Sequence, residues 1–438
     1  MPMITNKKSL FALSKSSLMQ AGRLLPIAVL TVAALLSACT SEKKLTADNR
    51  RPLTVELYTT LPGKLPYRIP AITQTPAGRL LVVSDYRPCG GDIGFGRVDL
   101  YVRHSEDGLI WSRQRAIAEG TGVKDAVDCG FGDGAIVSDR ETGEVLLLSV
   151  CGNTVYWAQT TTRQNPNRVA RFVSRDGGET WSKPEDISES VYSLFDACSK
   201  GPVESLFVGS GKIFQSSLLK AGKNYRIYAA LCARPNGNRV IYSDDLGQTW
   251  HALGSVDEFP APKGDEPKCV ELPDGNVLLS SRAMGGRIFN IFTYTDAKKG
   301  QGRWQTPAYS SADTKGVVAV NNSCNGGAQL VAVRRVSDGR KLYLLLQSVP
   351  FGPGRQSVGI YYKELESEQD YATPEAIARD WNGSYQVSTL PSAYSELYQL
   401  RDGRIAIVYE ESTQAADYSI QYSALSIEQI TGGKYRLR

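Results

Sequence analysis

The chain has 438 residues with 50 basic and 45 acidic side chains, a formal net charge of +5. Residues 1–38 hold four basic side chains and no acidic one, so the remaining 46 basic and 45 acidic residues are almost balanced. A near-neutral body gives no electrostatic reason to expect nucleic acid as a partner. The two histidines, His104 and His251, lie in or beside turn motifs. This placement argues against a Ser-His-Asp triad, a Cys-His pair or a histidine-bound metal.

The N-terminal segment predicts export. Basic residues precede an apolar run from Leu24 to Leu36, which at about 13 residues is too short to span a bilayer as a mature helix. The ending Leu36-Ser-Ala-Cys39 resembles a bacterial lipobox, which implies cleavage before Cys39 and a lipid on its sulfur. The alternative is an ordinary cleaved signal that leaves Cys39 in the mature tail. We expect residues 1–38 to be a lipoprotein signal peptide, 39–52 a polar tether, and 53–438 the body of a protein in the bacterial cell envelope.

Eight cysteines occur, and lipidation of Cys39 would leave seven, so at least one could not pair within the chain. Their spacing contains no CxxC pair, and we expect no zinc site. A domain of this size does not need disulfides, so several cysteines are expected to be small buried hydrophobic residues.

Strand patterns dominate from about residue 53 onward. Short runs rich in Val, Ile, Leu and Tyr alternate with Gly, Asp and Asn turns. The clearest runs are residues 79–84, 98–102, 144–150, 225–231, 276–280, 341–347 and 404–410. Residues 187–194 and 374–379 could form short helices, and no long amphipathic helix is predicted. The chain is therefore expected to be all-β.

A turn motif recurs within this pattern. Residues 174–181 (SRDGGETW) and 243–250 (SDDLGQTW) share five of eight positions and begin 69 residues apart. A copy that is one residue shorter begins at Ser105, another 69 residues upstream, and a weaker one leads to Trp304. Asp can accept hydrogen bonds from nearby backbone N–H groups, Gly permits positive φ, and the Trp is expected to be buried between neighbouring sheets. Repeated units of this kind predict a β-propeller.

These motifs resemble the Asp boxes of sialidases and related propellers, in which they lie in peripheral turns away from the active site. The body resembles bacterial exo-sialidases over nearly its whole length. The resemblance implies a six-bladed β-propeller without an appended lectin module. It also implies that the Asp boxes are structural.

The first local match is Tyr67-Arg68-Ile-Pro, which resembles the family's Phe/Tyr-Arg-Ile-Pro motif. The family binds the substrate carboxylate with three arginines from different blades, and the matching positions are Arg68, Arg282 and Arg355. Arginine suits this role because its planar, permanently charged guanidinium can bind a carboxylate in a bidentate manner. Surface arginines at strand ends would be the structural alternative.

A glycine-rich segment, residues 86–94, resembles the family's Asp loop and makes Asp92 the general acid/base, with Asp85 and Asp99 as rivals. Arg87 matches a pocket arginine. Asp133, in Gly132-Asp-Gly134, resembles a pocket aspartate near the N-acyl or glycerol group, with Asp128 as its rival.

The resemblance makes Tyr394 the nucleophile and Glu266 the base that activates it, with Glu271 as the rival base. A phenol ordinarily titrates near pH 10, so it needs a carboxylate within hydrogen-bond reach to remove its proton. A neutral phenol also avoids the repulsion that a carboxylate nucleophile would meet from the sugar's own carboxylate. Glu410 matches the carboxylate that orients the first arginine, with Glu411 as the alternative.

Together these matches imply an exo-α-sialidase that hydrolyses terminal sialic acids by a retaining mechanism, without a metal or other cofactor. The expected partners are sialylated glycans and, through Cys39, a membrane; the protein is expected to be a monomer. Three alternatives stay open: an intramolecular trans-sialidase, an enzyme for another 2-keto acid sugar with a changed pocket around Asp133, and a non-catalytic sialoglycan-binding lipoprotein.

Overall fold

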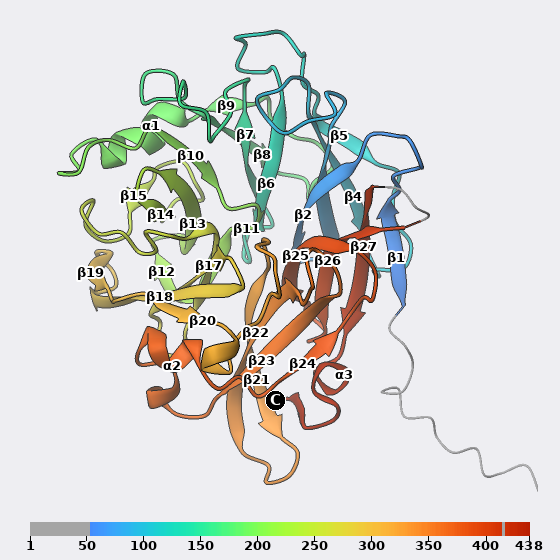
Figure 1. Ribbon diagram of the computed structural model, residues 1–438, viewed down its shortest axis with the longest axis vertical. Coiled ribbons are helices and arrows are strands. Elements are labelled where there is room, and N and C mark those ends of the chain that lie inside the picture. The colour runs from blue at the N-terminus through green and yellow to red at the C-terminus, as the bar shows by residue number, and fades with distance from the viewer. Residues whose placement is uncertain (1–52, 414–416) are drawn as a thin grey trace, which may run out of the picture. The chain divides into compact units, whose positions relative to one another are not determined.

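The computed structural model describes residues 53–413 and 417–438. The predicted signal peptide and tether lie outside the described residues. Within the described part, strands form six separate sheets arranged as the blades of a ring (Figure 1). The prediction of an all-β six-bladed propeller is confirmed.

The first three blades follow the chain order. Blade 1 contains β2 (Tyr67–Gln74), β3 (Leu80–Tyr86), β4 (Asp99–Ser105) and β5 (Arg115–Ala118). Blade 2 contains β6 (Phe131–Ser138), β7 (Val145–Cys151), β8 (Arg168–Ser174), β9 (Glu185–Asp186) and, parallel to β6, β11 (Gly211–Lys212). Blade 3 contains β10 (Ser205–Val208), β12 (Phe214–Ala221), β13 (Asn224–Arg234), β14 (Gly237–Ser243) and β15 (His251–Ala252).

The last three blades complete the ring. Blade 4 contains β16 (Asp265–Glu271), β17 (Val277–Ala283), β18 (Gly286–Asp296), β19 (Gln301–Trp304) and β20 (Ala308–Ser310). Blade 5 contains β21 (Ala328–Arg335), β22 (Lys341–Pro350), β23 (Val358–Leu365), β24 (Gly383–Gln386) and β28 (Tyr435–Leu437). Blade 6 contains β25 (Ser392–Gln399), β26 (Ile405–Ser412), β27 (Tyr418–Leu425) and β1 (Thr54–Tyr58). Because β1 pairs with β27, the first described strand closes the last blade and seals the ring.

Helices are short. The two expected ones are present as α1 (Ser188–Tyr192), followed by a 3-10 turn, and α2 (Pro374–Ala378). A third, α3 (Ile427–Thr431), was not predicted from the sequence. No helix among the described residues is long and apolar enough to cross a membrane.

The Asp-box turns have the local geometry expected from their sequence. In the box that begins at Ser174, Asp176 accepts hydrogen bonds from the N–H and the hydroxyl of Thr180. In the next box, Asp245 binds Thr249 in the same way. The serine at the start of each box accepts from the N–H of the box glycine, and this contact is also present in the short copy that begins at Ser105.

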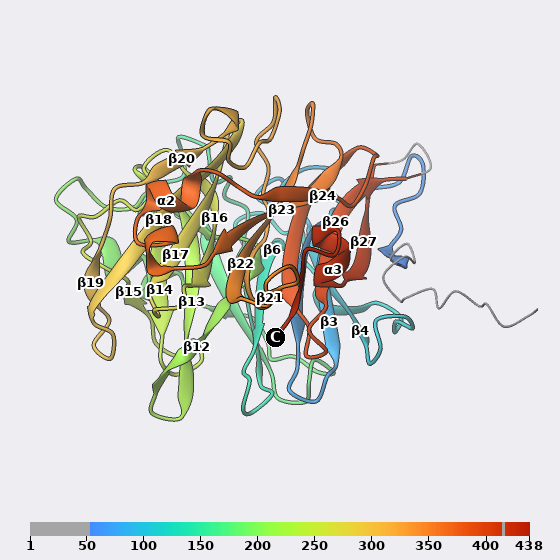
Figure 2. The ribbon, with the colours of Figure 1, turned by 90° about the horizontal axis from the view of Figure 1, so that it is seen from below.

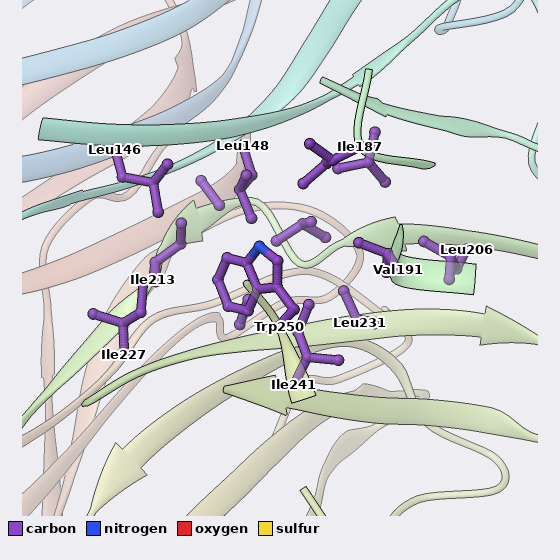
Figure 3. Packing of buried hydrophobic residues seen from close by; sticks show 14 of the residues in the cluster. Leu146, Leu148, Ile187, Val191, Leu206, Ile213, Ile227, Leu231, Ile241 and Trp250 are labelled. Atoms are coloured by element: carbon purple, nitrogen blue, oxygen red, sulfur yellow. The ribbon is translucent and has the colours of Figure 1, made fainter. Parts of the chain in front are cut away.

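Trp250, at the end of one box, is 6% exposed and lies in a core cluster shared by two blades. Its indole packs among Leu146 and Leu148 of blade 2 and Ile227 and Ile241 of blade 3 (Figure 3). The expected burial of this Trp between sheets is therefore confirmed. The boxes therefore stabilise the contact between blades. They follow the ends of β4, β8 and β14, at the opposite ends of these strands from the site described below.

The seven cysteines of the described part are unpaired, and all except Cys89 are buried. This burial agrees with their expected role as small hydrophobic residues.

Seen from the side, the ring carries loops and hairpins on both faces (Figure 2).

Candidate active site

The predicted site residues meet on one face of the ring because the inner strands β2, β6, β16 and β25 all begin there. A cavity of about 400 Å³ opens on this face. It is lined by eight of the nine residues predicted from the sequence, namely Arg68, Arg87, Asp92, Asp133, Glu266, Arg282, Arg355 and Tyr394. The ninth, Glu410, lies directly behind Arg68.

A β-bulge interrupts each of these four inner strands at the site. The pairing shifts by one residue between Arg68 and Ala71, Gly132 and Ala135, Asp265 and Pro267, and Ser392 and Ser395. Each bulge gives the inner strand one extra residue, and bulges are known to re-aim side chains. Ile69 and Asp133 have φ values of 56° and 51°, a left-handed conformation that costs energy for residues other than glycine. The site is therefore built where the sheets depart from regular pairing.

Arg68 is held by a buried carboxylate. Its Nε lies 2.7 Å from Oε1 of Glu410, which is fully buried, and its Nη2 lies 3.3 Å from Oε2. Glu410 also accepts the N–H groups of Ile69 at 2.8 Å and Tyr394 at 3.1 Å. Burial disfavours the charge on Arg68, but the ion pair with Glu410 outweighs it and raises the pKa of the guanidinium. One carboxylate thus fixes both an arginine and the backbone of the expected nucleophile.

On the other side of the cavity, Arg282 is hydrogen-bonded to both Glu266 and Tyr394. Its Nη1 donates to Glu266 Oε2 at 2.8 Å and to Tyr394 Oη at 3.0 Å, and its Nε donates to Ser323 Oγ at 2.9 Å. Burial works against its charge, yet the nearby Glu266 raises the pKa of this guanidinium above its ordinary value. Glu266 therefore stabilises the charged form of Arg282.

Arg355 stands above the same phenol, with Cζ 5.5 Å from the centre of the Tyr394 ring. The guanidinium groups of Arg68 and Arg282 lie at 5.7 and 6.0 Å from that centre. No hydrogen bond or ion pair joins the Arg355 side chain to any residue in the described part. Three cations surround one ring, and within the described residues one of them has no hydrogen-bonded or ion-paired side-chain partner, so together they form a site for an anion.

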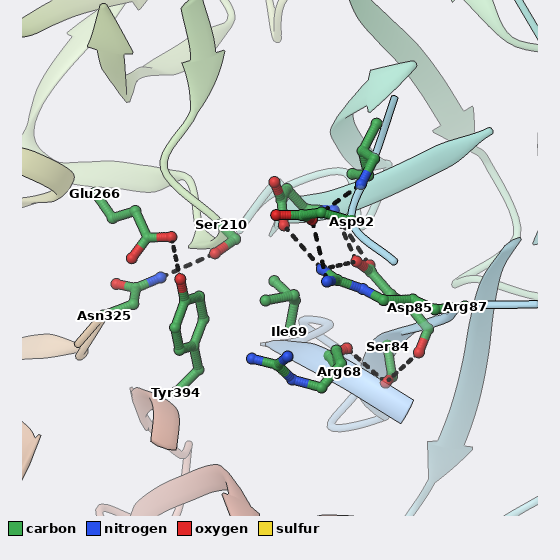
Figure 4. Close-up of polar contacts among 12 residues, drawn as sticks. Arg68, Ile69, Ser84, Asp85, Arg87, Asp92, Ser210, Glu266, Asn325 and Tyr394 are labelled. Atoms are coloured by element: carbon green, nitrogen blue, oxygen red, sulfur yellow. Dashed lines mark hydrogen bonds and ion pairs between the residues drawn. The ribbon is translucent and has the colours of Figure 1, made fainter. Parts of the chain in front are cut away.

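Tyr394 and Glu266 form the closest pair in the cavity. The phenol donates to Glu266 Oε1 at 2.5 Å, across 128 positions of sequence (Figure 4). Burial is the main cause that raises the pKa of Tyr394 well above its usual value, and the negative charge of Glu266 adds to it. The resting phenol is therefore protonated, and its proton already points at a carboxylate that can take it during reaction.

Arg87 organises the opposite side, where Asp92 lies (Figure 4). Its Nη1 is 3.1 Å from Asp92 Oδ1, and its Nη2 is 3.3 Å from Asp85 Oδ2 and 3.8 Å from Asp133 Oδ1. Asp92 is the most exposed of these three carboxylates, with 58% of its side chain accessible, and it lines the cavity together with Asp133. Burial raises the pKa of Asp85 to about 7 and raises that of Asp133, so these two carboxyl groups around one guanidinium compete for a proton.

The rival positions lie elsewhere. Asp85 is fully buried and accepts the N–H of Asp133, so it supports the cavity from beneath rather than lining it. Asp99 is buried against Arg97, and Asp128 is hydrogen-bonded to Thr121. Glu271 binds Ser216 and Ser217 at the far end of β16, and Glu411 binds Ser388 on the other side of β26.

An apolar wall of the cavity was missed in the sequence. It consists of Ile93, Val150, Val155, Tyr156, Trp157 and Phe207. The rings of Tyr156 and Phe207 pack edge to face with centres 4.7 Å apart. These residues carry no motif. Only their place at the end of β7, in the loops that follow β3 and β7, and in β10 could have indicated them.

Within the described residues, no group of three or more His, Cys, Asp or Glu side chains could hold a metal ion. The arrangement offers instead an anion site, a phenol paired with a carboxylate, and an exposed acid across the cavity.

Comparison with known proteins gives the family. A model described as a BNR repeat-like domain matches residues 90–407. A sialidase of Micromonospora viridifaciens is 34% identical over 223 residues, which cover 49% of this chain but 32% of that protein. A sialidase of Paraclostridium sordellii is 25% identical over 372 residues, covering 82% of this chain and 84% of that one.

Among solved structures, the intramolecular trans-sialidase of Ruminococcus gnavus superposes with a TM-score of 0.62 at 16% identity, over 83% of this chain and 95% of that one. This likeness shows the shared fold. With a matched segment that contains most of the propeller, the chain belongs to the BNR repeat-like family, and the proteins that it resembles include bacterial sialidases.

Proposed function

We propose that this protein is an exo-α-sialidase that removes terminal sialic acids from glycans with retention of configuration. The observation that carries the proposal is the contact between Tyr394 Oη and Glu266 Oε1 beneath three arginines. A sialoside has a carboxylate on its anomeric carbon, and the arginine triad would place that carbon over the phenol. The family relationship supports the same substrate class.

In the first step, the Tyr394 oxygen attacks the anomeric carbon while its proton passes to Glu266. The bond to the leaving oxygen breaks, and Asp92 donates a proton to that oxygen. In the second step, Asp92 accepts a proton from water as the water oxygen attacks the anomeric carbon. The bond between that carbon and the Tyr394 oxygen breaks, and the released phenolate takes its proton back from Glu266. Tyrosine nucleophiles are a known exception to the two-carboxylate rule of glycosidases.

The apolar wall around Tyr156 and Phe207 would take the acyl substituent of the sugar, and Asp133 would face its polar edge. The three arginines would be equally suited to another 2-keto acid sugar, so this wall is where the choice between substrates would be made.

The test is an NMR time course of sialyl-lactose hydrolysis. We expect the α anomer of free sialic acid first, because two inversions restore the starting configuration. Release of the β anomer first would exclude the retaining mechanism. A product lighter by one water would identify an intramolecular trans-sialidase. Binding of sialyl-lactose without turnover would identify a sialoglycan-binding protein.

We further propose that the protein is an exported lipoprotein held to a membrane through Cys39, on the basis of Leu36-Ser-Ala-Cys39. In a bacterial host, the full chain should fractionate with membranes and a Cys39→Ala variant should not. Equal membrane association of the two proteins would reject the lipid anchor.

A further inference from the structure

A second cavity, which we call the central well, opens on the face of the ring opposite the active site. Its volume is about 570 Å³, and it shares no lining residue with the active-site cavity. The inner strands β2, β6, β16 and β25, which begin at the active site, end around this well at Gln74, Ser138, Glu271 and Gln399. The short strand β11 lies near the centre of the ring and brings Lys212 into the well (Figure 1). The well is therefore the other end of the central axis, and the proposed reaction does not use it.

Lys212 crosses the axis and forms the floor of the well. It belongs to the sheet of blade 2, and its Nζ donates at 2.9 to 3.1 Å to three neutral oxygens of blades 5 and 6, which are the carbonyls of Ala328 and Leu397 and the side-chain oxygen of Gln329. Burial lowers its pKa to about 8. The acid that opposes this shift is Glu396, which is itself ion-paired at 3.3 Å with the buried Lys268. The ammonium at the floor thus has no counter-ion of its own.

Two further cations, Arg140 and Arg401, line the well and are exposed to solvent. Neither forms an ion pair with a residue in the described part of the chain, and their guanidinium groups donate to neutral oxygens. Among the residues that line the well, the single acid is Glu271, and its carboxylate already accepts hydrogen bonds from Ser216 and Ser217. Positive charge therefore exceeds negative charge around the well, which favours an anion inside it.

The wall of the well also carries polar groups without partners. Ser138 is 5% exposed, and its hydroxyl has no hydrogen-bond partner among the described residues. The side-chain amide of Gln399 and the hydroxyl of Tyr343 likewise make no hydrogen bond within the described part. A buried hydroxyl without a partner costs free energy that a ligand could recover. Between these groups lie the apolar side chains of Ile213 and Leu330.

This combination of groups matches the chemistry of a sugar. Sugar hydroxyls both donate and accept hydrogen bonds, as amide and hydroxyl side chains require, and the C–H faces of a sugar ring can pack on apolar and tyrosine side chains. The volume lies in the range of small-molecule sites, whereas a bare inorganic anion would answer the charge and leave the wall unused.

We propose that the central well is a second binding site and that it takes a sugar that carries a carboxylate. The carboxylate would meet Arg140 and Arg401, and the hydroxyls would meet Ser138 and the amide side chains of the wall. None of these residues belongs to the catalytic site, so the inference does not rest on the proposed function.

The test is an NMR titration of the protein labelled at its isoleucine δ1 methyl groups. Ile213 lines the well and Ile93 lines the active-site cavity, so the two signals report the two cavities separately. The variants Ile213→Val and Ile93→Val assign them. The probes are glucuronate and N-acetylneuraminate, with glucose as the neutral counterpart of glucuronate and inorganic sulfate as an anion without a sugar. We expect a saturable shift of Ile213 with at least one acidic sugar, and none with glucose or sulfate at the same concentration.

The double variant Arg140→Gln with Arg401→Gln should weaken binding at Ile213 by about 10-fold, because two partly exposed charges are lost. Its matched control, Arg113→Gln with Arg175→Gln, removes the same charge from exposed residues outside the well and should leave the affinity unchanged.

Three results would overturn the inference: no saturable shift of Ile213, an equal shift with glucose or sulfate, or equal affinity in the two double variants. N-acetylneuraminate that shifts Ile93 alone would support the proposed function and reject the second site. A shift of Ile213 without a shift of Ile93 would keep the second site and count against the proposed function.

Discussion

Glu410→Gln tests how one buried carboxylate supports the site. Glu410 accepts four N–H groups, two from Arg68 and one each from the backbones of Ile69 and Tyr394. Gln has nearly the same shape, but one oxygen becomes an NH₂ group that must face another donor. Removing one partner of a buried ion pair costs about 3–5 kcal/mol. Arg68 retains 18% exposure of its side chain, so we expect the lower end, about 3 kcal/mol of unfolding free energy.

The same substitution should weaken catalysis, because it releases the Arg68 guanidinium and the Tyr394 backbone together. A loss of about 3 kcal/mol in transition-state binding corresponds to a fall of roughly 100-fold in kcat/KM. Urea unfolding and steady-state kinetics on an aryl sialoside measure the two effects. Glu411→Gln is the matched control, since its carboxylate binds Ser388 away from the cavity and should leave kcat/KM unchanged. Equal kcat/KM values for the two variants would refute the reasoning.

The remaining predictions concern the nucleophile, the third arginine, the blade contact and pH. Tyr394→Phe should lower kcat by several orders of magnitude with little change in melting temperature, and a near-normal kcat would remove this residue from its role. Arg355→Lys keeps the charge but loses bidentate binding, so KM for the sialoside should rise at least about 10-fold at unchanged stability; an unchanged KM would contradict the anion site. Trp250→Ala should lower the unfolding free energy by about 3–5 kcal/mol in urea, and a loss below about 1 kcal/mol would show that the indole does not join the blades. Because burial raises the pKa of Asp85 to about 7, the folded protein binds more protons than the unfolded one between about pH 4 and 7, so stability should fall as pH rises through this window. Asp85→Asn should flatten that dependence in urea unfolding at pH 5 and 8, and an equal slope in the variant would reject the assignment.

Local features could be read from the sequence because they depend on neighbouring residues. The Asp-box turns at Ser174 and Ser243 close through contacts within the motif, so their geometry follows from the residues themselves. Repetition of these turns predicted a ring of blades. The resemblance then predicted nine site residues, of which eight line one cavity and Glu410 stands behind it.

The tertiary structure decided which of two similar residues faces the cavity. Glu266 and Glu271 lie on the same strand, but only the first stands at the end where β16 begins and where the bulge turns it inward. Asp85 and Asp92 lie seven positions apart, yet Asp85 is fully buried against Arg87 and the side chain of Asp92 is exposed to solvent. Strand alternation and turn patterns hold no signal for either distinction, because a bulge and the burial of a side chain depend on the strand alongside; the sequence analysis made both choices only through the family resemblance.

The sequence by itself therefore determined the blades, their turns and the residue types of the site. Only the closed ring decided that the Tyr394 phenol meets Glu266 across 128 positions, and that the buried Lys268 lies 3.3 Å from the buried Glu396. The physical reason is that turns and strand alternation arise from contacts a few residues apart. Contacts across the central axis exist only when all six blades pack and β1 joins β27 to complete the circle.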